Sequence, residues 1–213
     1  MKMPDLVALS NYNVNRRDEG EGFWQPLYDY QTYALAGQTS LRFFAIPRGQ
    51  GGKTLADTNM SSAGVLPTPI QELVTGIQIV LYPGINPGRT GDFANTGDYW
   101  NDIKAVAESG FLEFTIGSKV YCTDAPLNAF PPAFRLSGAA ALADATTAAA
   151  ALHSQIDYAS FAGPTYAINP GIRLISNQNF DVTLSWPTAV ALPSGVDARI
   201  GVRLLGWQYR LSQ

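Results

Sequence analysis

The sequence is poor in the residues that most often build catalytic and metal sites. Its 213 residues include one cysteine, Cys122, and one histidine, His153. A single cysteine excludes a disulfide within the chain. One cysteine and one histidine also exclude the zinc sites that proteins build from these two residue types. Cys122 lies in a predicted strand without a base beside it, so we expect a packed apolar side chain and not a reactive thiol.

Charged residues are scarce as well. They make up 15% of the chain, against about 25% in an average globular protein. The net charge is −3. This acidic balance argues against direct binding of nucleic acid, because a surface that binds phosphates needs a basic patch to displace counterions.

Long hydrophobic runs are absent too. No apolar run approaches the ~20 residues that span a bilayer, and residues 1–10 lack the apolar core of a signal peptide. We therefore expect no transmembrane segment. We also expect a protein made and folded in the cytoplasm, which suits a chain without disulfides.

What the chain does contain is alternation of apolar and polar residues, which is typical of strands with one buried face. The clearest case is the end of the chain, where residues 180–186 alternate, a turn follows at 192–195, and a second run covers 199–211. Similar runs predict further strands at 39–46, 72–82, 111–116, 119–122 and 167–176.

One helix is predicted with a clear buried face. Residues 98–109 place Tyr99, Ile103 and Val106 on one side, and a glycine follows the last helical residue. Residues 124–137 are proline-rich and are expected to be irregular.

The alanine-rich segment 138–153 is consistent with either a helix or an extended loop. The whole pattern predicts a mainly β chain. Residues 37–213 are expected to form a single antiparallel β-sandwich or jelly roll with one or two short inserted helices.

Residues 1–36 are predicted to form an N-terminal arm. The first part is polar and punctuated by glycine, and an aromatic cluster follows with Phe23, Trp24, Tyr28 and Tyr30. Such an arm could be tied down on its own domain or could dock on a neighbouring subunit. The sequence leaves both interpretations open.

The last predicted strand changes phase at residues 204–205. Up to residue 204 the apolar residues are the even-numbered Ile200, Val202 and Leu204. From residue 205 they are the odd-numbered Leu205, Trp207, Tyr209 and Leu211. A β-bulge at this point would let both sets face one core. Alternatively, the strand buries one face in its own domain and the other against a partner, with Arg199, Arg203 and Arg210 partnered or at a rim.

One motif resembles a phosphate-binding loop. Residues 47–54 end in Gly52-Lys53-Thr54 and follow a predicted strand. The motif needs a glycine where this chain has Pro47, and the residues after Thr54 are poor helix formers. Without a helix N-terminus, phosphates lose the aligned N–H groups that hold them. We therefore expect a flexible glycine-rich loop and no nucleotide site.

Other candidate chemistry is scattered. His153 has Ser154 and Asp157 nearby but no nucleophile-elbow motif accompanies them. The remaining candidates are carboxylates: Asp92, Asp98 and Asp102 for calcium, and Glu72, Glu108, Glu113 and Asp181 for glycoside hydrolysis. Of these, Glu113 and Asp181 alternate with apolar neighbours and are expected to face water. We expect no enzymatic activity, no catalytic residue, no cofactor and no metal.

Three stretches give the chain a recognisable pattern: 41–47 (LRFFAIP), 51–60 (GGKTLADTNM) and 180–209. Together with the loops rich in proline and glycine, the polar arm and the low charge, they resemble the jelly-roll capsid proteins of tailless icosahedral bacterial viruses. The resemblance implies a single-barrel subunit, because 213 residues hold one jelly roll. A major, minor, vertex or decorating capsid protein is equally compatible.

The resemblance implies a viral structural protein that self-assembles into a shell. Its partners would be copies of itself and other capsid proteins, with no small-molecule substrate, and its location would be the virion. The candidate assembly contacts are aromatic: Phe23, Trp24, Tyr28, Tyr30, Trp207 and Tyr209. The alternative is a carbohydrate-binding or other ligand-binding β-sandwich module, in which aromatic side chains form a platform for sugar rings.

Overall fold

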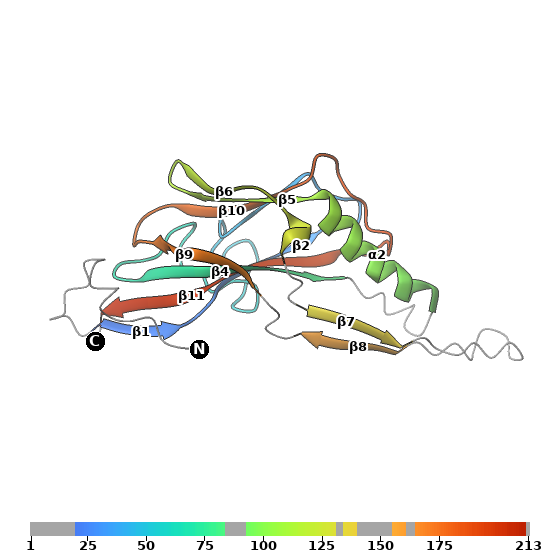
Figure 1. Ribbon diagram of the computed structural model, residues 1–213, viewed down its shortest axis with the longest axis horizontal. Coiled ribbons are helices and arrows are strands. Elements are labelled where there is room, and N and C mark those ends of the chain that lie inside the picture. The colour runs from blue at the N-terminus through green and yellow to red at the C-terminus, as the bar shows by residue number, and fades with distance from the viewer. Residues whose placement is uncertain (1–19, 84–92, 131–133, 140–154, 161–164, 212–213) are drawn as a thin grey trace, which may run out of the picture.

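The chain folds into two antiparallel sheets that pack face to face (Figure 1). The computed structural model describes residues 20–83, 93–130, 134–139, 155–160 and 165–211. Its elements in chain order are β1 (Gly20–Trp24), β2 (Leu27–Tyr33), β3 (Ser40–Phe43), β4 (Gln71–Tyr82), α2 (Phe93–Ser109), β5 (Phe111–Ile116), β6 (Lys119–Pro126), η2 (Leu127–Ala129), β7 (Phe134–Ala139), β8 (Gln155–Ser160), β9 (Tyr166–Leu174), β10 (Phe180–Ser185) and β11 (Ala198–Leu211).

The strand order is that of a jelly roll. Sheet A has the order β1-β11-β4-β9, with β2 also paired to β11, and sheet B has the order β3-β10-β5-β6. When β1 and the separate β7–β8 pair are left aside, eight strands remain. If these eight are numbered 1 to 8 along the chain, sheet A has the order 1-8-3-6 and sheet B has the order 2-7-4-5. This is the connectivity of two interlocked Greek keys. The predicted β-sandwich fold is confirmed.

The core lies between the sheets and is filled by alternate residues of each strand. In sheet B, Phe180, Val182 and Leu184 of β10 point inward together with Leu112 and Phe114 of β5, and all are buried. Complete burial of a side chain of this size stabilises the fold by about 1.5–3 kcal/mol. The alternation visible in the sequence therefore corresponds to the inner face of this sheet.

Helix α2 covers one end of the sandwich and is fastened there by hydrogen bonds (Figure 1). The indole N–H of Trp186 donates to the carbonyl of Val106 over 3.0 Å, and the carboxylate of Asp102 accepts the Ser194 N–H at 2.9 Å. Val106 and Asp102 are both buried. Among the helices of the described residues, none has the length and hydropathy needed to cross a membrane.

Two segments differ from the sequence prediction, and a third lies mostly outside the described residues. The helix begins at Phe93 and not at residue 98. The stretch 124–137, predicted to be irregular, contains the end of β6, the short helix η2 and the start of β7. Strand β7 then takes in residues 138 and 139, while 140–154 lie outside the described residues.

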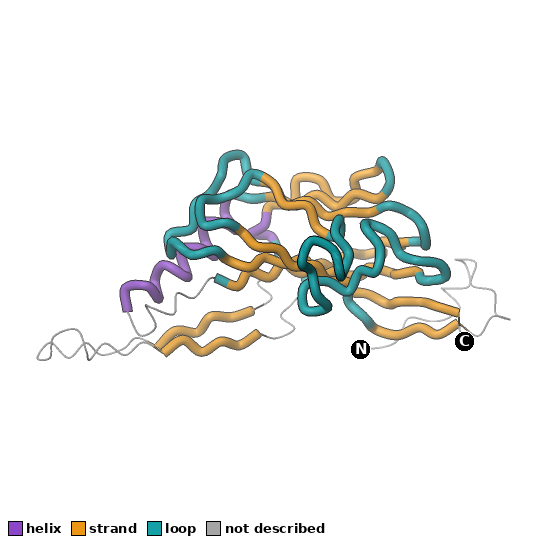
Figure 2. The backbone as a smooth tube through the Cα atoms, turned by 180° about the vertical axis from the view of Figure 1, so that it is seen from behind, coloured by secondary structure: helices purple, strands orange, loops and turns teal. Residues whose placement is uncertain are grey.

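Strands β7 and β8 form a two-stranded ribbon apart from the sandwich. Their register runs from Phe134 opposite Ser160 to Ala139 opposite Gln155, and within the described chain neither strand pairs with another. Figures 1 and 2 both place the ribbon at the helical end of the molecule, below α2 and on the side of sheet A. An isolated two-stranded ribbon is marginally stable in water.

Strands β1 and β2 behave as one interrupted strand. Trp24 of β1 stands opposite Trp207 and Leu27 of β2 stands opposite Leu204, so both keep a single register along the same edge of β11. The interruption falls at Pro26, which has no N–H for the ladder. The arm predicted for residues 1–36 therefore contains two strands of the sandwich, and residues 1–19 lie outside the described part.

Strand β11 carries one row of side chains on each face of the sheet, and it contains no bulge. Leu205 pairs with Gly76 and Gly206 with Val74, so the extra residue is Thr75 of β4. The predicted alternative of a bulge within β11 is therefore wrong. Even-numbered residues from Ile200 to Gln208 are buried toward the core, and the odd-numbered side chains at 203, 205, 207 and 209 are half-buried on the outer face.

This arrangement predicts unequal effects from two adjacent leucines. Leu204→Ala should lower the free energy of unfolding by about 2–5 kcal/mol, because it leaves a cavity in the core. Leu205→Ala should cost about 1 kcal/mol in the isolated subunit, because that side chain is half-buried on the outer face. Urea unfolding of both variants measures the difference. Equal losses would contradict the assignment of faces.

Candidate functional site

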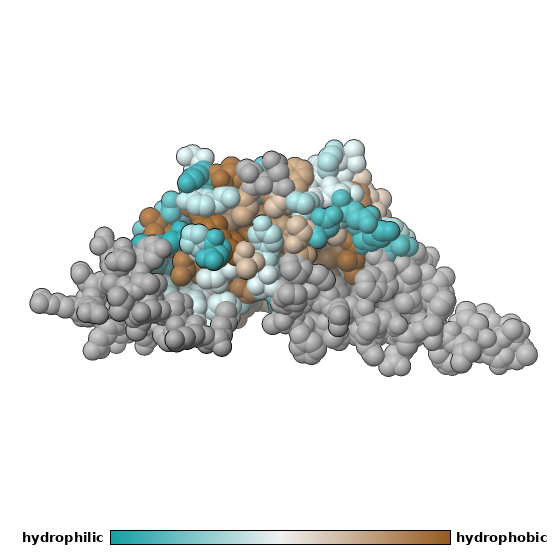
Figure 3. Space-filling model, in the orientation of Figure 1, coloured by the Kyte–Doolittle hydropathy of each residue, from teal (hydrophilic) through white to brown (hydrophobic). Residues whose placement is uncertain are grey.

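The outer face of sheet A, which is turned away from sheet B, carries a cluster of large side chains. We call this cluster the outer aromatic face; its members are Trp24, Tyr28, Leu73, Leu205, Trp207 and Tyr209. The rings of Trp24 and Trp207 meet edge to face, with centroids 5.7 Å apart and planes at 81°. Trp24 is 40% exposed, and the other members are half-buried. Apolar side chains also interrupt the polar surface in the edge-on view of Figure 3.

The six predicted assembly contacts do not all share this face. Trp24, Tyr28, Trp207 and Tyr209 belong to the outer aromatic face. Tyr30 lies on the same side of the sheet but is 7% exposed. Phe23 stands opposite Gln208 in the ladder and therefore points to the inner side, where the guanidinium of Arg210 lies 5.1 Å from its ring centroid.

Two arginines bury Tyr30. The guanidinium of Arg199 lies 4.5 Å from the centroid of its ring, and Nε of Arg203 donates to its hydroxyl over 2.7 Å. Burial raises the pKa of the Tyr30 phenol. Arg199 also donates to the carboxylate of Asp57 at 2.8 Å. Arg199 and Arg203 thus have partners within the subunit itself.

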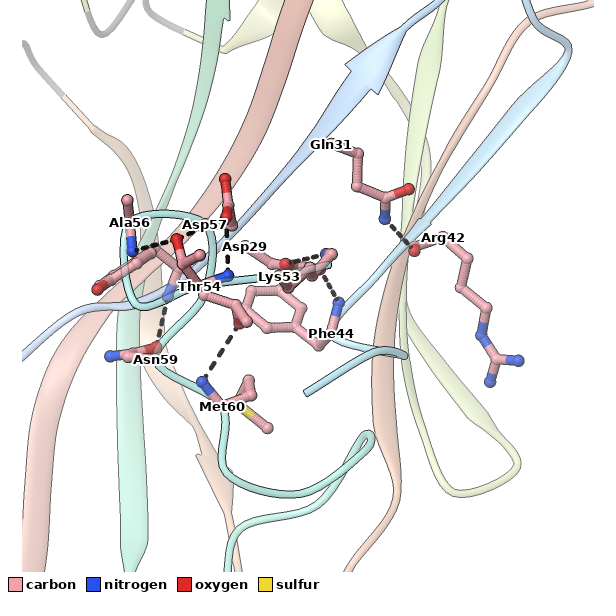
Figure 4. A network of polar contacts seen from close by, with 12 residues as sticks. Asp29, Gln31, Arg42, Phe44, Lys53, Thr54, Ala56, Asp57, Asn59 and Met60 are labelled. Atoms are coloured by element: carbon pink, nitrogen blue, oxygen red, sulfur yellow. Dashed lines mark hydrogen bonds and ion pairs between the residues drawn. The ribbon is translucent and has the colours of Figure 1, made fainter. Parts of the chain in front are cut away.

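A buried ion pair anchors the glycine-rich loop to β2 (Figure 4). Asp29 is 0% exposed and pairs with the ammonium of Lys53, whose side chain is 10% exposed. Asp29 also accepts the backbone N–H of Phe44 at 2.7 Å, which holds Phe44 in a left-handed conformation with φ of 66°. Loss of solvation dominates at Asp29 and raises its pKa, although the hydrogen bond from Lys53 opposes this.

The same loop closes the free edge of β2. The Tyr30 N–H donates to the carbonyl of Asp57 over 2.8 Å, and the Tyr28 N–H donates to Oδ1 of Asn59 over 3.0 Å. The Asp57 carboxylate in turn accepts the N–H and hydroxyl of Thr54 at 2.9 and 2.8 Å, and these bonds lower its pKa. The loop is thus held by specific contacts, whereas the sequence analysis predicted a flexible loop.

These contacts explain the apparent phosphate-binding motif. A cleft of about 920 Å³ opens beside the loop and is lined by residues that include Tyr30, Lys53 and Arg199. Both cations already have carboxylate partners, Asp29 and Asp57. No α-helix follows the motif, because residues 54–57 form a turn and the next regular element is β4. The motif therefore lacks the helix N-terminus on which a phosphate-binding loop depends.

Glu72 is a second buried acid. Unlike Asp29, it is not paired with a lysine of the described residues and does not accept a backbone N–H from them. It is 0% exposed on the inner face of β4, between Gln208 of β11 and Leu174 of β9. Neither carboxyl oxygen has a well-formed hydrogen bond. Burial raises its pKa to about 8, and the nearby Gln208 amide lowers it only slightly. Sequence analysis missed this burial because Glu72 opens a strand where a surface acid is the ordinary choice.

The other predicted candidates do not gather into a site. Glu113 and Asp181 are partly exposed on the outer side of sheet B, as expected, and Asp181 pairs with Arg42 at 2.7 Å. Asp102 accepts a hydrogen bond from the Ser194 backbone. Among the described residues no group of three metal-ligating side chains converges. His153, Ser154 and Asp92 lie outside the described part, and Cys122 is half-buried, with its pKa raised by burial.

The ion pair of Asp29 and Lys53 predicts that replacing Lys53 strongly lowers the stability of the fold. Lys53→Met should lower the free energy of unfolding by about 3–5 kcal/mol, because it leaves the Asp29 carboxylate buried without a cation. Arg48→Met, in the exposed part of the same loop, should change it by less than about 0.5 kcal/mol. The double variant Asp29→Asn/Lys53→Met should recover part of the loss. Urea titrations that gave equal losses for Lys53→Met and Arg48→Met would refute the anchor.

Glu72 predicts an unusual pH dependence of stability. Its pKa of about 8 in the folded state exceeds the usual 4.5, so between these values the folded state keeps a proton that the unfolded state has lost. Stability should therefore fall as pH rises through this window, by up to about 5 kcal/mol. Glu72→Gln should remove this slope, and Glu108→Gln, an exposed control, should keep it. Thermal melts from pH 5 to 9 measure both.

The function of the chain has to be inferred from its own geometry. No protein-family model, curated protein sequence or solved structure matches it. That geometry consists of a jelly roll, a glycine-rich loop that covers the edge of β2, and a row of aromatic side chains on the outside of one sheet.

Proposed function

We propose that the protein is a structural subunit that assembles with copies of itself, as a capsid protein of a bacterial virus does. One observation carries the proposal. Strand β11 completes the core with one row of side chains and presents a second row, from Leu205 to Tyr209, on the outer face. Large aromatic groups in this position are the usual centre of a protein–protein interface.

The strand edges favour assembly through faces. Unpaired edges invite further strands, and natural proteins block them. Here the β2 edge is covered by residues 57–59, and on β3 the side chain of Gln31 donates to the carbonyl of Arg42. Strand β9 contains Pro170, and the pairing of β6 with β5 shifts register twice. Contacts between copies would therefore rest on side chains of the sheet faces.

The ribbon of β7 and β8 supports the same proposal. It is built from residues 134–139 and 155–160 and lies on the side of sheet A, apart from the sandwich (Figure 1). Two strands alone gain little from pairing in water. A neighbouring subunit would supply a surface on which the ribbon packs, and the ribbon would then contribute to a larger interface.

The aromatic geometry weighs against the alternative of a sugar-binding module. A sugar ring stacks on flat aromatic faces that lie in one plane, but Trp24 and Trp207 meet at 81°. Tyr30 is covered by Arg199 and Arg203. The net charge of −3 suits contacts with protein more than contacts with a genome. Under this proposal the partners are copies of the chain and other capsid proteins, and the location is the virion.

One substitution tests the proposal. Trp207→Glu should raise the protein concentration needed for assembly at least tenfold, because it places a charge at the centre of the outer aromatic face. Tyr121→Glu, at a tyrosine 45% exposed on β6 of the other sheet, is the matched control and should assemble normally. Light scattering measures assembly, electron microscopy shows whether shells close, and melting temperatures verify that both variants fold.

Two results would overturn the proposal. The first is a wild-type chain that stays monomeric at high concentration and in the presence of excluded-volume agents. The second is binding of the isolated subunit to a glycan affinity gel that Trp207→Glu abolishes, since this would assign the same surface to a sugar.

A further inference from the structure

The buried pair of Asp29 and Lys53 brings an amine and a carboxyl group together in a site that excludes water. Asp29 is 0% exposed and the Lys53 side chain is 10% exposed. Nζ of Lys53 donates a hydrogen bond to Oδ1 of Asp29 (Figure 4). For well-aligned groups, such proximity replaces a concentration of about 10⁵–10⁸ M of the separate reactants. The pair therefore meets the first requirement of a condensation between two side chains.

The surroundings of the pair make its uncharged form accessible. Burial is the largest influence on Asp29 and raises its pKa, so the protonated carboxyl forms more readily here than in water. A proton that passes along the hydrogen bond from Lys53 to Asp29 leaves a neutral amine beside a neutral acid. These are the forms that condense to an amide, because only the neutral amine has a free electron pair.

Fixed hydrogen-bond donors surround the carboxyl group of Asp29. The Phe44 N–H donates to Oδ2 over 2.7 Å. The Thr58 hydroxyl adds a further hydrogen bond to the carboxyl group, and its oxygen accepts the Met60 N–H at 3.2 Å. Attack on a carboxyl carbon places negative charge on an oxygen, and donors already in position stabilise that charge. Oδ2 is held to receive this charge, while Oδ1, beside Lys53, is placed to leave.

The other carboxylate near Lys53 has a different environment. The charges of Asp57 and Lys53 interact, but the Asp57 side chain is 30% exposed and pairs with Arg199. It also accepts the N–H and hydroxyl of Thr54. Hydrogen bonds and a cation of this kind favour the ionised carboxylate, which is a poor electrophile. Asp29 is therefore the acid that can react.

We propose that Asp29 and Lys53 condense to an isopeptide bond, which fastens the glycine-rich loop covalently to β2. The flexible stem of Lys53 brings the neutral Nζ over the face of the carboxyl group, and Nζ forms a bond to Cγ of Asp29. The bond from Cγ to Oδ1 breaks, and a proton from the nitrogen joins the departing hydroxyl.

The step is balanced without a co-reactant. An ammonium and a carboxylate become one neutral amide and one water, so nothing is oxidised or reduced. The water has a way out, because Lys53 lines the cleft of about 920 Å³ beside the loop. The product also removes two charges from a buried site, where each is costly. This inference does not rest on the proposed capsid function.

Mass spectrometry of the full wild-type chain tests the bond. After incubation in the folded state, the denatured chain should be lighter than its sequence mass by one water, about 18 Da. Trypsin should no longer cleave after Lys53. Peptide 18–42, which contains Asp29, should then be recovered joined to peptide 49–89.

Two controls accompany this measurement. Lys53→Arg keeps a cation beside Asp29 but removes the nucleophilic amine, so it should have its full sequence mass and a melting curve that verifies folding. The exposed pair of Lys104 and Glu108, with 3.9 Å between charged atoms, should stay unjoined in the wild type, because water keeps both groups ionised.

Three results would overturn the inference. The first is a wild-type chain that keeps its full mass after prolonged incubation in the folded state, a result that needs no variant to fold. The second is a loss of water that persists in Lys53→Arg, which would place the dehydration elsewhere. The third is a loss of water confined to peptide 49–89, which would assign the bond to Asp57.

Discussion

The structure depends on the pairing of β11 along both of its edges. Strand β4 covers one edge, and β2 followed by β1 covers the other, so one strand at the end of the chain ties together segments from its beginning and middle. Its inner row, including Ile200, Val202 and Leu204, is fully buried. Because these contacts are distant in sequence, neither sheet A nor the outer aromatic face exists before β11 is in place.

Two buried acids in sheet A show how the surroundings decide the role of a carboxylate. Asp29 has a cation, a backbone donor and a threonine, and these contacts attach the glycine-rich loop to the sheet. Glu72 is as deeply buried, but among the described residues the polar group beside it is the neutral amide of Gln208. The first therefore secures the edge of β2, whereas burial raises the pKa of the second to about 8.

The proposed function is argued from the parts of the sheets that can contact another subunit. The loop at 57–59 covers the edge of β2 and the Gln31 side chain bonds to β3, while Pro170 lies in β9 and the pairing of β6 with β5 shifts register. The outer side of sheet A carries the large side chains of the outer aromatic face. A surface of that kind favours contacts between side chains of neighbouring subunits, which suits a subunit that tiles with copies of itself.

The sequence by itself determined the fold class, because alternation in residues 180–186 and 199–211 reflects which side chains avoid water. It also showed that β11 has two apolar rows. Only the tertiary structure decided that the bulge lies at Thr75 of β4 and that Lys53 forms an ion pair with a buried aspartate. The burial of Glu72 was likewise decided by the tertiary structure. Each of these depends on partners far away in the chain, and a local pattern carries no information about which distant strand will lie alongside.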